Sequence, residues 1–295
     1  MLQEQGQGIV GRVELSPDEL AAVRGLLERC NAHDGTELVL ALTPGGAAPG
    51  NPQQYFLAYE AGTLVGVLAL VGYREVEGCG MVAPEWRRRG IGRRLAVTAG
   101  DELARRGLAS WLLVCDEAAP AGMAFATALG GERAFAEHRL ALDPARVPAT
   151  ASSAGPLAFR QARPPDAAPL AAITAAAFGD PVTEVEGWLT TDLTRSDRRW
   201  FVATLDGAAV GSLRVVAEED GVYITAFGVH PSQQGHGYGR ALLSRTLALL
   251  LAEGRQPIWI EVETDNQAAL GLYRACGFVE QHTYTYWRIA VGSGQ

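Results

Sequence analysis

The chain has 295 residues, a length that predicts about two domains of roughly 100 to 200 residues each. Hydrophobic residues make up 48% of it and charged residues 20%, which is enough apolar material for sizeable cores and excludes a globally disordered protein. The formal net charge of −8 has the wrong sign for binding a phosphate backbone, so we expect no nucleic-acid partner.

The N-terminus and the cysteines narrow the class of protein further. Residues Met1 to Gly8 lack the basic start and apolar stretch of a signal peptide, and no apolar run approaches the roughly 18 residues of a membrane helix. The cysteines lie far apart, without a Cys-x-x-Cys pair or a nearby histidine. These features predict a cytoplasmic protein with no membrane partner, no disulfide framework and no bound metal. The cysteines are Cys30, Cys79, Cys115 and Cys276.

The first half of the chain predicts a strand, a helix and a hairpin, followed by alternating strands and helices. After a strand at Ile9–Leu15, the residues Ser16 to Glu19 open a helix, because they combine a serine cap, a first-turn proline and a capping-box glutamate. The β-rich runs Tyr55–Tyr59 and Leu64–Tyr73 flank a glycine-containing turn, which is typical of an antiparallel hairpin. The remaining elements are expected as a strand at Gly78–Val82, a helix at Ile91–Arg106, a strand at Trp111–Cys115, a helix at Ala121–Leu129 and a strand at Ala134–Leu142.

The second half predicts the same order of elements. Strands at Trp200–Leu205 and Ala209–Val216 are joined by the tight-turn dipeptide Asp206-Gly207. They are followed by a strand at Val222–Val229, a helix at Gly239–Glu253, a strand at Ile258–Glu263, a helix at Asn266–Cys276 and a strand at Val279–Ile289. Strands and helices thus alternate around a mixed sheet in each half, a layered α/β architecture repeated twice.

Residue identities recur at a nearly constant spacing, which indicates an internal repeat. Trp111 and Val114 return as Trp259 and Val262, a shift of 148 positions. A shift of 147 relates Val82, Pro84, Gly90, Gly92, Arg93 and Leu95 to Val229, Pro231, Gly237, Gly239, Arg240 and Leu242. We therefore predict a first domain at residues 1–147, a Pro/Ala/Ser-rich linker at 148–155 and a second domain at 156–295.

The segment between Val229 and Arg240 is the most informative part of the sequence. Gly235, Gly237 and Gly239 let the backbone turn sharply and gather N–H groups at the N-terminus of the predicted helix, where the helix dipole favours an anion. Residues 82–93 have the same construction with more positive charge. A plain strand-to-helix connection is the alternative. The spacing of a dinucleotide-binding loop and the Gly-Lys-Ser/Thr ending of a nucleotide-triphosphate loop are both missing.

Two motifs of the second half resemble those of the GNAT superfamily of N-acetyltransferases. Gln234-x-x-Gly237-x-Gly239, preceded by Val-x-Pro, resembles its acetyl-CoA signature, and residues 261–278 resemble its second motif. In the first half, Arg87-x-x-Gly90-x-Gly92 also resembles the acetyl-CoA signature. The resemblance covers almost the whole chain. It implies two tandem GNAT-like domains of the α/β (α+β) class, each a mixed, mostly antiparallel sheet flanked by helices.

The resemblance also implies acetyl-CoA as the cosubstrate and no metal. Backbone amides of the glycine-containing loop would hold the pyrophosphate, and a backbone N–H near Val229 would bind the thioester oxygen, a contribution of about 3 to 4 kcal/mol in the transition state. The residues predicted to bind the cofactor in the second half are Phe227, Gly228, Val229, Gln234, Gly235, His236, Gly237, Tyr238, Gly239, Arg240 and Asn266. In the first half they are Arg87, Arg88, Arg89, Gly90, Ile91, Gly92 and Arg93, for which a solvated basic face is the alternative.

Two side chains are predicted to move protons. Tyr273 is the candidate general acid for the departing thiolate, since its ordinary pKa of about 10 keeps it protonated, although an aromatic packed on an amphipathic helix is the alternative. Glu261 is the first candidate for the general base, acting directly or through water, with a solvated strand carboxylate as the alternative. His230 and His236 are less favoured bases. Asn266, beyond its implied contact with the cofactor, is a good helix N-cap.

The two halves differ at the positions of the second motif. Where the second half has Asn266 and Tyr273, the first half offers Ala118 or Ala119 and Phe125 or Ala126, depending on a one-residue slip. No hydroxyl is supplied by either choice. The sequence therefore predicts catalysis in the second half and a degenerate first half that stabilises the molecule, shapes the acceptor cleft or binds a second CoA.

The predicted activity is transfer of the acetyl group of acetyl-CoA to a primary amine of a small molecule or peptide, by direct attack in a ternary complex. The enzyme is expected to be a monomer or a homodimer. The tandem plan is also similar to that of the mycothiol synthase family, in which the C-terminal half is active, so acetylation of a cysteinyl pseudo-disaccharide is an alternative. A CoA-binding or interaction module without turnover is a further alternative, against which Tyr273 and Asn266 argue.

Overall fold

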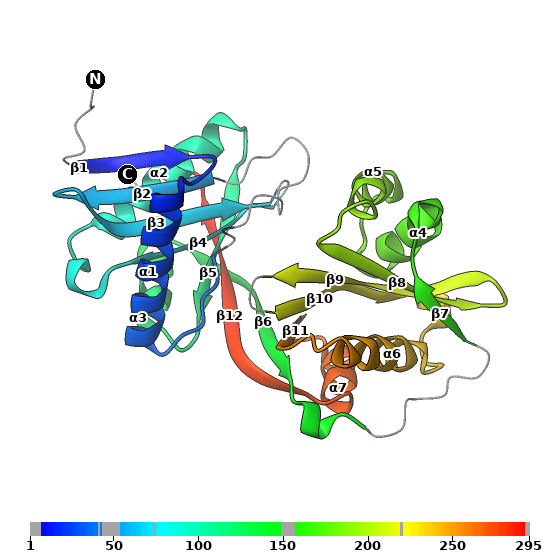
Figure 1. Cartoon of the computed structure of the whole chain (residues 1–295). Helices are drawn as coiled ribbons and strands as arrows, with labels where there is room; N and C mark the ends of the chain where they lie inside the picture. Colours follow the sequence, from blue (N-terminus) through cyan, green and yellow to red (C-terminus); the bar gives the residue numbers. More distant parts are fainter. Residues whose placement is uncertain are drawn as a thin grey trace. The chain divides into compact units, whose positions relative to one another are not determined.

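The computed structural model describes residues 7–40, 42, 54–72, 75–148, 157–218 and 221–292. The chain divides into two compact units, of which the first comprises Met1–Glu137 with His282–Gln295 and the second comprises His138–Gln281. Each unit is a sheet with helices on both faces (Figure 1). No helix within the described ranges is long and apolar enough to cross a membrane.

The first unit has the strand order β1-β2-β3-β4-β5-β12. Helix α1 (Pro17–Asp34) packs on one face through residues that include Val23 and Leu26, while α2 (Ile91–Arg105) and α3 (Pro120–Ala128) pack on the other. All neighbouring strands with a determined register run antiparallel except β4 and β5, which are parallel. The strands are β1 (Gln7–Arg12), β2 (Gln54–Glu60), β3 (Thr63–Val71), β4 (Glu77–Val82), β5 (Ser110–Asp116) and β12 (Phe278–Ala290).

The second unit has the strand order β6-β11-β10-β9-β8-β7. Helices α4 (Ala167–Phe178) and α5 (Val182–Asp192) lie on one face of this sheet, and α6 (Tyr238–Ala252) and α7 (Gln267–Ala275) lie on the other (Figure 1). The larger core is on the α6 side. The strands are β6 (Glu132–Leu142), β7 (Ala158–Gln161), β8 (Arg198–Leu205), β9 (Ala208–Glu218), β10 (Gly221–Val229) and β11 (Ile258–Glu263). Short 3₁₀ helices lie at Pro84–Trp86, Pro144–Arg146, Pro164–Asp166 and Pro231–Gln233.

Local sequence signals account for the start of α1 and for the hairpin turns. The Ser16 hydroxyl accepts the Glu19 N–H at 3.2 Å and the Glu19 carboxylate accepts the Ser16 N–H at 2.9 Å, which confirms the predicted capping box. The turn between β8 and β9 places Asp206 and Gly207 at φ values of 49° and 84°, the positive pair that a type I′ turn requires. The β2–β3 turn has the same geometry, with φ values of 49° and 79°.

Two long strands cross the boundary between the units. Residues Tyr284–Ala290 of β12, near the end of the chain, pair antiparallel with β5 in the first unit. Their side chains add to this pairing, because the Tyr284 hydroxyl donates to the Glu37 backbone carbonyl at 2.9 Å. Strand β6 runs from the first unit into the second, where its neighbour is β11. The domain boundaries at 1–147, 148–155 and 156–295, which come from the sequence repeat, remain a prediction. In the structure, β6 and β12 each begin in one compact unit and end in the other.

The predicted strands and helices are present, with ends that differ by a few residues. The expected end of β3 at Tyr73 and residues 149–155 of the expected linker lie outside the described residues. The sequence analysis did not assign β7, α4 or α5. Helix α4 is rich in alanine on all sides and so lacks the polar face that marks an amphipathic helix, and α5 begins after Pro181 without a side-chain cap.

Candidate active site

The parallel strands β10 and β11 separate partway along the sheet of the second unit. They pair only from Val222 to Ile224, opposite Ile258 to Ile260. Beyond this point β10 continues against β9 alone and contains a bulge between Thr225 and Gly228, where Ala226 adopts a φ of 47°. The divergence leaves the β11-facing edge of β10 without a strand partner from Thr225 onward. This opening is where the resemblance implies that pantetheine lies.

The loop after β10 carries the features of an anion site. Gly235 and Gly237 adopt φ values of 80° and 79°, and Gly237 caps α6 without a side chain in the way of the first-turn N–H groups. A Cβ on Gly239 would lie 3.4 Å from Val229, 3.5 Å from Leu272 and 3.6 Å from a Phe227 ring atom. The backbone of this loop therefore suits a pyrophosphate, and the close packing at Gly239 holds the start of α6 against β10.

Val229 presents a backbone donor to the opening. The His230 N–H bonds to the Val210 carbonyl of β9 at 2.9 Å. Because successive residues of a strand direct their N–H groups to opposite edges, the Val229 N–H faces away from β9. The Val229 carbonyl on that edge already accepts the Gln234 side-chain amide at 3.1 Å. The arrangement leaves an N–H donor beside the opening.

Tyr273 lies on α7 with its ring in the core and is only 6% exposed. Its ring centre is 6.0 Å from that of Phe227 and 6.2 Å from that of Phe278. Burial raises the pKa of Tyr273 well above its ordinary value, so the phenol is protonated across the working pH range. The hydroxyl has no hydrogen-bond partner within the described residues. A protonated, unpartnered phenol beside Phe227 fits the predicted proton donor.

Asn266 and Glu261 occupy the two ends of the connection that leads into α7. The Asn266 side-chain oxygen accepts the Ala269 N–H at 3.1 Å, which confirms its capping role and leaves the amide NH₂ to point elsewhere. Glu261 is exposed and is the first β11 residue beyond the paired segment. Because Ile260 and Val262 face the core, Glu261 lies on the opposite face of the sheet, together with Trp259.

The two loop histidines are occupied with local contacts. The His230 ring nitrogen Nδ1 lies 2.9 Å from the Ser232 hydroxyl and caps the short 3₁₀ helix. His236 is exposed, and its ring stacks on that of Tyr238 with the centres 5.5 Å apart. Neither histidine is brought to the opening between β10 and β11 by a contact in the structure.

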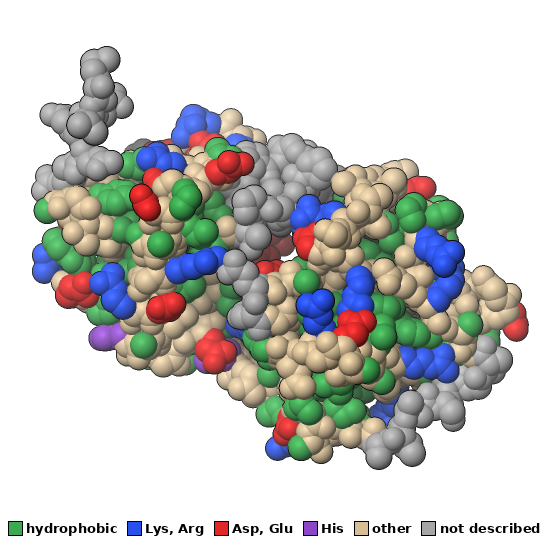
Figure 2. All heavy atoms as spheres, viewed as in Figure 1, with side chains coloured by type: hydrophobic (Ala, Val, Ile, Leu, Met, Phe, Trp, Pro, Cys, Tyr) green, Lys and Arg blue, Asp and Glu red, His purple; other side chains and the backbone are tan. Residues whose placement is uncertain are grey.

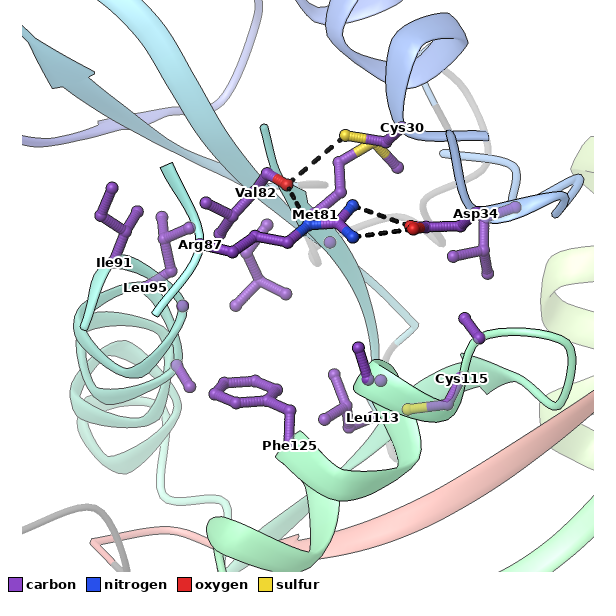
Figure 3. Close-up of a pocket in the computed structure, with 18 of the residues that line it drawn as sticks. Cys30, Asp34, Met81, Val82, Arg87, Ile91, Leu95, Leu113, Cys115 and Phe125 are labelled. Atoms are coloured by element: carbon purple, nitrogen blue, oxygen red, sulfur yellow. Dashed lines mark hydrogen bonds and ion pairs between the residues drawn. The ribbon is translucent and has the colours of Figure 1, made fainter. Parts of the chain in front are cut away.

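The first unit holds an apolar cavity of 470 Å³ at the equivalent place (Figure 3). Ile91 and Leu95 of α2 line one side, and Phe125 of α3 lines another. Arg88 and Arg93 of the predicted phosphate loop line it as well. Cys115 also faces this cavity, and burial raises the pKa of its thiol to about 12, which keeps it protonated and unreactive.

Arg87 contributes to the first unit in a way that its sequence position did not predict. Its guanidinium forms two 2.7 Å bonds to the Asp34 carboxylate and one of 2.9 Å to the Val82 carbonyl (Figure 3). The side chain thus ties α1 to the end of β4, and the ion pair with Asp34 balances the charge that it could offer to an anion. In the second unit Gln234 makes the equivalent contact with Val229.

Other arginines of the predicted loop also have protein partners. The Arg89 guanidinium lies 4.6 Å from the centre of the Trp86 ring and donates to the Glu85 carbonyl at 3.1 Å. Arg93 donates to the Ala128 carbonyl at 3.1 Å. Arg88 adopts a φ of 62°, and its side chain has no hydrogen-bond or ion-pair partner among the described residues. The basic character of this segment is therefore only partly available to a ligand.

Equivalent contacts settle the one-residue slip between the halves. A Cβ on Gly92 would touch Phe125 and Val82, just as one on Gly239 would touch Leu272 and Val229. Phe125 thus matches Leu272, so Ala126, which is fully buried, matches Tyr273. In the same register Ala119 matches Asn266, and each of these two residues is the N-cap of its helix. The first unit lacks both polar side chains.

We expect Arg87→Gln to lower the free energy of unfolding by about 2 kcal/mol near neutral pH, because it removes two charge-assisted hydrogen bonds and keeps the contact with Val82. The Arg87 hydrogen bonds are the largest cause that lowers the pKa of Asp34 below its ordinary 3.8. The stabilisation is fully present above pH 3.8, the ordinary pKa of an aspartate. It is lost as the pH falls through the lower pKa that Asp34 has in the folded protein. Denaturant unfolding of both proteins at neutral and acid pH measures it, and a pH-independent difference would contradict the assignment.

A protonated phenol in the core beneath a sheet that opens between two strands, with a glycine-containing helix N-terminus next to the opening, suits acyl transfer from a CoA thioester. The fold and the site define the class of acetyl-CoA-dependent acyltransferases. Within the described ranges there is no group of three His, Cys, Asp or Glu side chains that could hold a metal ion.

The comparisons with known proteins agree with this class. The model of the acetyltransferase (GNAT) family matches residues 168–278, and that of an acetyltransferase (GNAT) domain matches residues 51–130. The chain is 31% identical over 297 residues to the mycothiol acetyltransferase of Clavibacter michiganensis subsp. michiganensis, covering 91% of both chains. It is 29% identical over 306 residues to that of Thermobispora bispora, covering 95% of this chain and 98% of the relative. The chain belongs to the GNAT family, with two such domains in tandem.

A solved structure shows the same fold over nearly the whole chain. It is the GCN5-related N-acetyltransferase from Sphaerobacter thermophilus, with a TM-score of 0.78 and 19% identity, covering 99% of this chain and 97% of that one.

Proposed function

We propose that this protein transfers the acetyl group of acetyl-CoA to a primary amine of a small molecule or peptide, in its second unit. The observation that carries the proposal is the difference at equivalent positions, where Asn266 and Tyr273 stand against Ala119 and Ala126. Both units have a glycine loop at a helix N-terminus, but at the position of Tyr273 the first unit has Ala126, which supplies no phenol. The second unit is therefore the one with a proton for the departing thiolate.

The residues of the second unit divide the reaction among them. The loop from Gln234 to Arg240 binds the pyrophosphate through its backbone, and the amide NH₂ of Asn266 contacts the pantetheine. The Val229 N–H binds the thioester oxygen as negative charge develops on it. Glu261 removes a proton from the amine, directly or through water, and the amine then attacks the carbonyl carbon in a ternary complex. Tyr273 donates its proton to the sulfur as the C–S bond breaks.

The first unit has a separate role in this proposal. Its cavity of 470 Å³ and its loop at the start of α2 suit a second CoA, which would be bound without turnover. The absence of a phenol at Ala126 removes the proton donor, and Arg87 is committed to the ion pair with Asp34. The first unit then stabilises the molecule and does not catalyse the reaction.

Acetylation of a cysteinyl pseudo-disaccharide of the mycothiol synthase type is a second candidate. It is favoured by the relatives named mycothiol acetyltransferase, which match along 91% and 98% of their own length. The two candidates share the chemistry and differ in the acceptor, so a panel of amines that includes a cysteinyl glycoside separates them.

The proposal is tested by following free thiol release while the protein is incubated with acetyl-CoA and a panel of amines. All 25 basic residues of the chain are arginines, so no lysine side chain of the protein itself can accept acetyl and raise the background. We expect release that depends on the amine. Tight CoA binding with no release for any amine would support the alternative of a CoA-binding module.

A further inference from the structure

Arg214 is held in a fixed position on the face of the second unit's sheet that carries α4 and α5. It projects from β9, its Nε donates to the Thr225 hydroxyl at 2.9 Å, and its Nη1 lies 3.4 Å from the Asp192 carboxylate. The guanidinium carbon is 5.9 Å and 5.8 Å from the ring centres of Trp188 and Trp200. An arginine held by an anion, a hydroxyl and two indoles has little freedom left to lose on binding a ligand.

The charge of Arg214 is only partly balanced by its surroundings. Asp192 is its only carboxylate partner within the described residues, and that carboxylate also binds Arg198 and accepts the Trp200 indole N–H at 2.7 Å. Burial lowers the pKa of Arg214, which reflects a cation with reduced solvation. The second terminal nitrogen, Nη2, has no partner within those residues and is not sealed from solvent. It is a hydrogen-bond donor directed by a rigid frame.

Arg214 is held next to the point where β10 and β11 separate. Its partner Thr225 is the last β10 residue before the bulge, and Glu261 is the residue next along the register on β11. Arg214 and Glu261 thus lie on the two strands that flank β10, on the same face of the sheet. The other face is filled by the core under α6 and α7. An acceptor amine bound at Glu261 on this face would therefore lie next to Thr225.

We propose that the acceptor carries an oxyanion group, a carboxylate or a phosphate, which Arg214 binds through Nη2. The proposal rests on the proposed function for the second unit. Paired strands in a sheet are about 4.8 Å apart, and because β10 and β11 diverge from Thr225 onward, β9 and β11 are separated here by at least about 10 Å. The amine and the anion of the acceptor should then be several bonds apart, as in an ω-amino acid or an aminoalkyl phosphate, and an α-amino acid is too short.

Matched pairs of acceptors test the proposal. One arm compares ε-aminocaproate with its neutral amide, and a second compares an aminoalkyl phosphate of the same length with the corresponding alcohol. We expect kcat/KM to favour the anion by about 10- to 100-fold in at least one arm, the range that charge-assisted hydrogen bonds provide. The two arms identify which oxyanion is preferred. Equal or reversed preference in both arms overturns the proposal.

Variants separate Arg214 from general effects of charge. Arg214→Gln should reduce the preference for the anion about tenfold, and Arg214→Lys should restore part of it. The control is Arg199→Gln, which removes an arginine from the neighbouring strand β8 that pairs with Glu253, and it should leave the preference unchanged. Melting temperatures of all variants establish that the fold is retained.

A binding measurement keeps this proposal distinct from the proposed function. Trp188 and Trp200 flank Arg214, so their fluorescence should respond when an ω-amino acid binds. Saturable binding that weakens at least tenfold in Arg214→Gln supports the anion site even where no acetyl transfer occurs, an outcome that would count against the proposed function alone. Binding that Arg214→Gln leaves unchanged overturns the anion site, whether or not the protein turns over.

Discussion

Tyr273→Phe is expected to lower kcat for thiol release by about 100-fold or more while the Kd for CoA changes little, since general acids contribute 10²- to 10⁴-fold. The substitution removes only a hydroxyl that has no partner within the described residues. The ring contacts with Phe227 and Phe278 remain, so the fold and the slot are preserved. Steady-state kinetics together with calorimetric titration of CoA separate the chemical step from binding.

The control for this variant is Tyr59→Phe in the first unit. Tyr59 is half-buried and, like Tyr273, has a pKa raised by burial, but it lies on β2 in the first unit, near Glu19 and Arg12. Its substitution should leave kcat unchanged. If Tyr273→Phe and Tyr59→Phe have the same kcat as the unaltered protein, Tyr273 is not the proton donor and its place in the core is structural.

The sequence predicted most elements of the fold because their signals are local. The capping box at Ser16 and the Asp206-Gly207 turn each depend on a few adjacent residues, and both formed as expected. The exchange of β6 and β12 depends instead on pairings between distant residues, such as Tyr284 with Asp116. Such long-range register leaves no mark in the local pattern, so the sequence alone does not predict that the end of β12 pairs with β5 in the first unit.

The candidate site was predictable where a motif fixes the backbone and less so where side chains meet from separate elements. Gly235 and Gly237 adopt positive φ values, which fit the sharp turn predicted for the loop, while Gly239 lies in the first turn of α6. The ion pair between Arg87 and Asp34 joins residues 53 positions apart, so Arg87 was interpreted only as part of a basic loop. Arg214 was missed altogether, although an arginine inside the apolar stretch 210–216 is itself a signal that a buried strand carries a charge for a reason.

The partly buried contacts of Arg214 with Asp192 and Thr225 differ in expected energy from the charged pairs on the exposed surface. On the face seen in Figure 2, acidic and basic side chains are interspersed over the second unit. Surface pairs of this kind contribute little to stability or recognition. The Asp192 carboxylate is only 5% exposed, so removing it would leave two guanidinium groups facing each other in a poorly solvated place. Because substitution of Asp192 would itself destabilise the fold, Arg214 is the residue to substitute in a test of binding.

The matched glycines Gly237 and Gly90 provide the sharpest test of which unit is catalytic. They are the N-caps of α6 and α2, with φ values of 79° and 78°, and a Cβ on either would meet no atom within 4 Å. Valine at each site therefore introduces the same left-handed backbone strain of about 1 to 2 kcal/mol, and its Cβ meets no neighbouring atom. We expect relaxation of this strain to move the first-turn N–H groups that are proposed to hold the pyrophosphate.

We expect Gly237→Val to lower kcat/KM for acetyl-CoA by about 5- to 30-fold, the factor that 1 to 2 kcal/mol represents, and Gly90→Val to have a much smaller effect on the same constant. Calorimetric titration should show two CoA sites per chain in the unaltered protein. Each valine substitution should weaken CoA binding at the site in its own unit and leave the other site unchanged. Because the two substitutions introduce the same strain, a difference in turnover shows which loop takes part in the reaction and does not arise from a difference in stability. Equal losses of turnover would mean that both units take part in the reaction, and a larger loss from Gly90→Val would move the active site to the first unit.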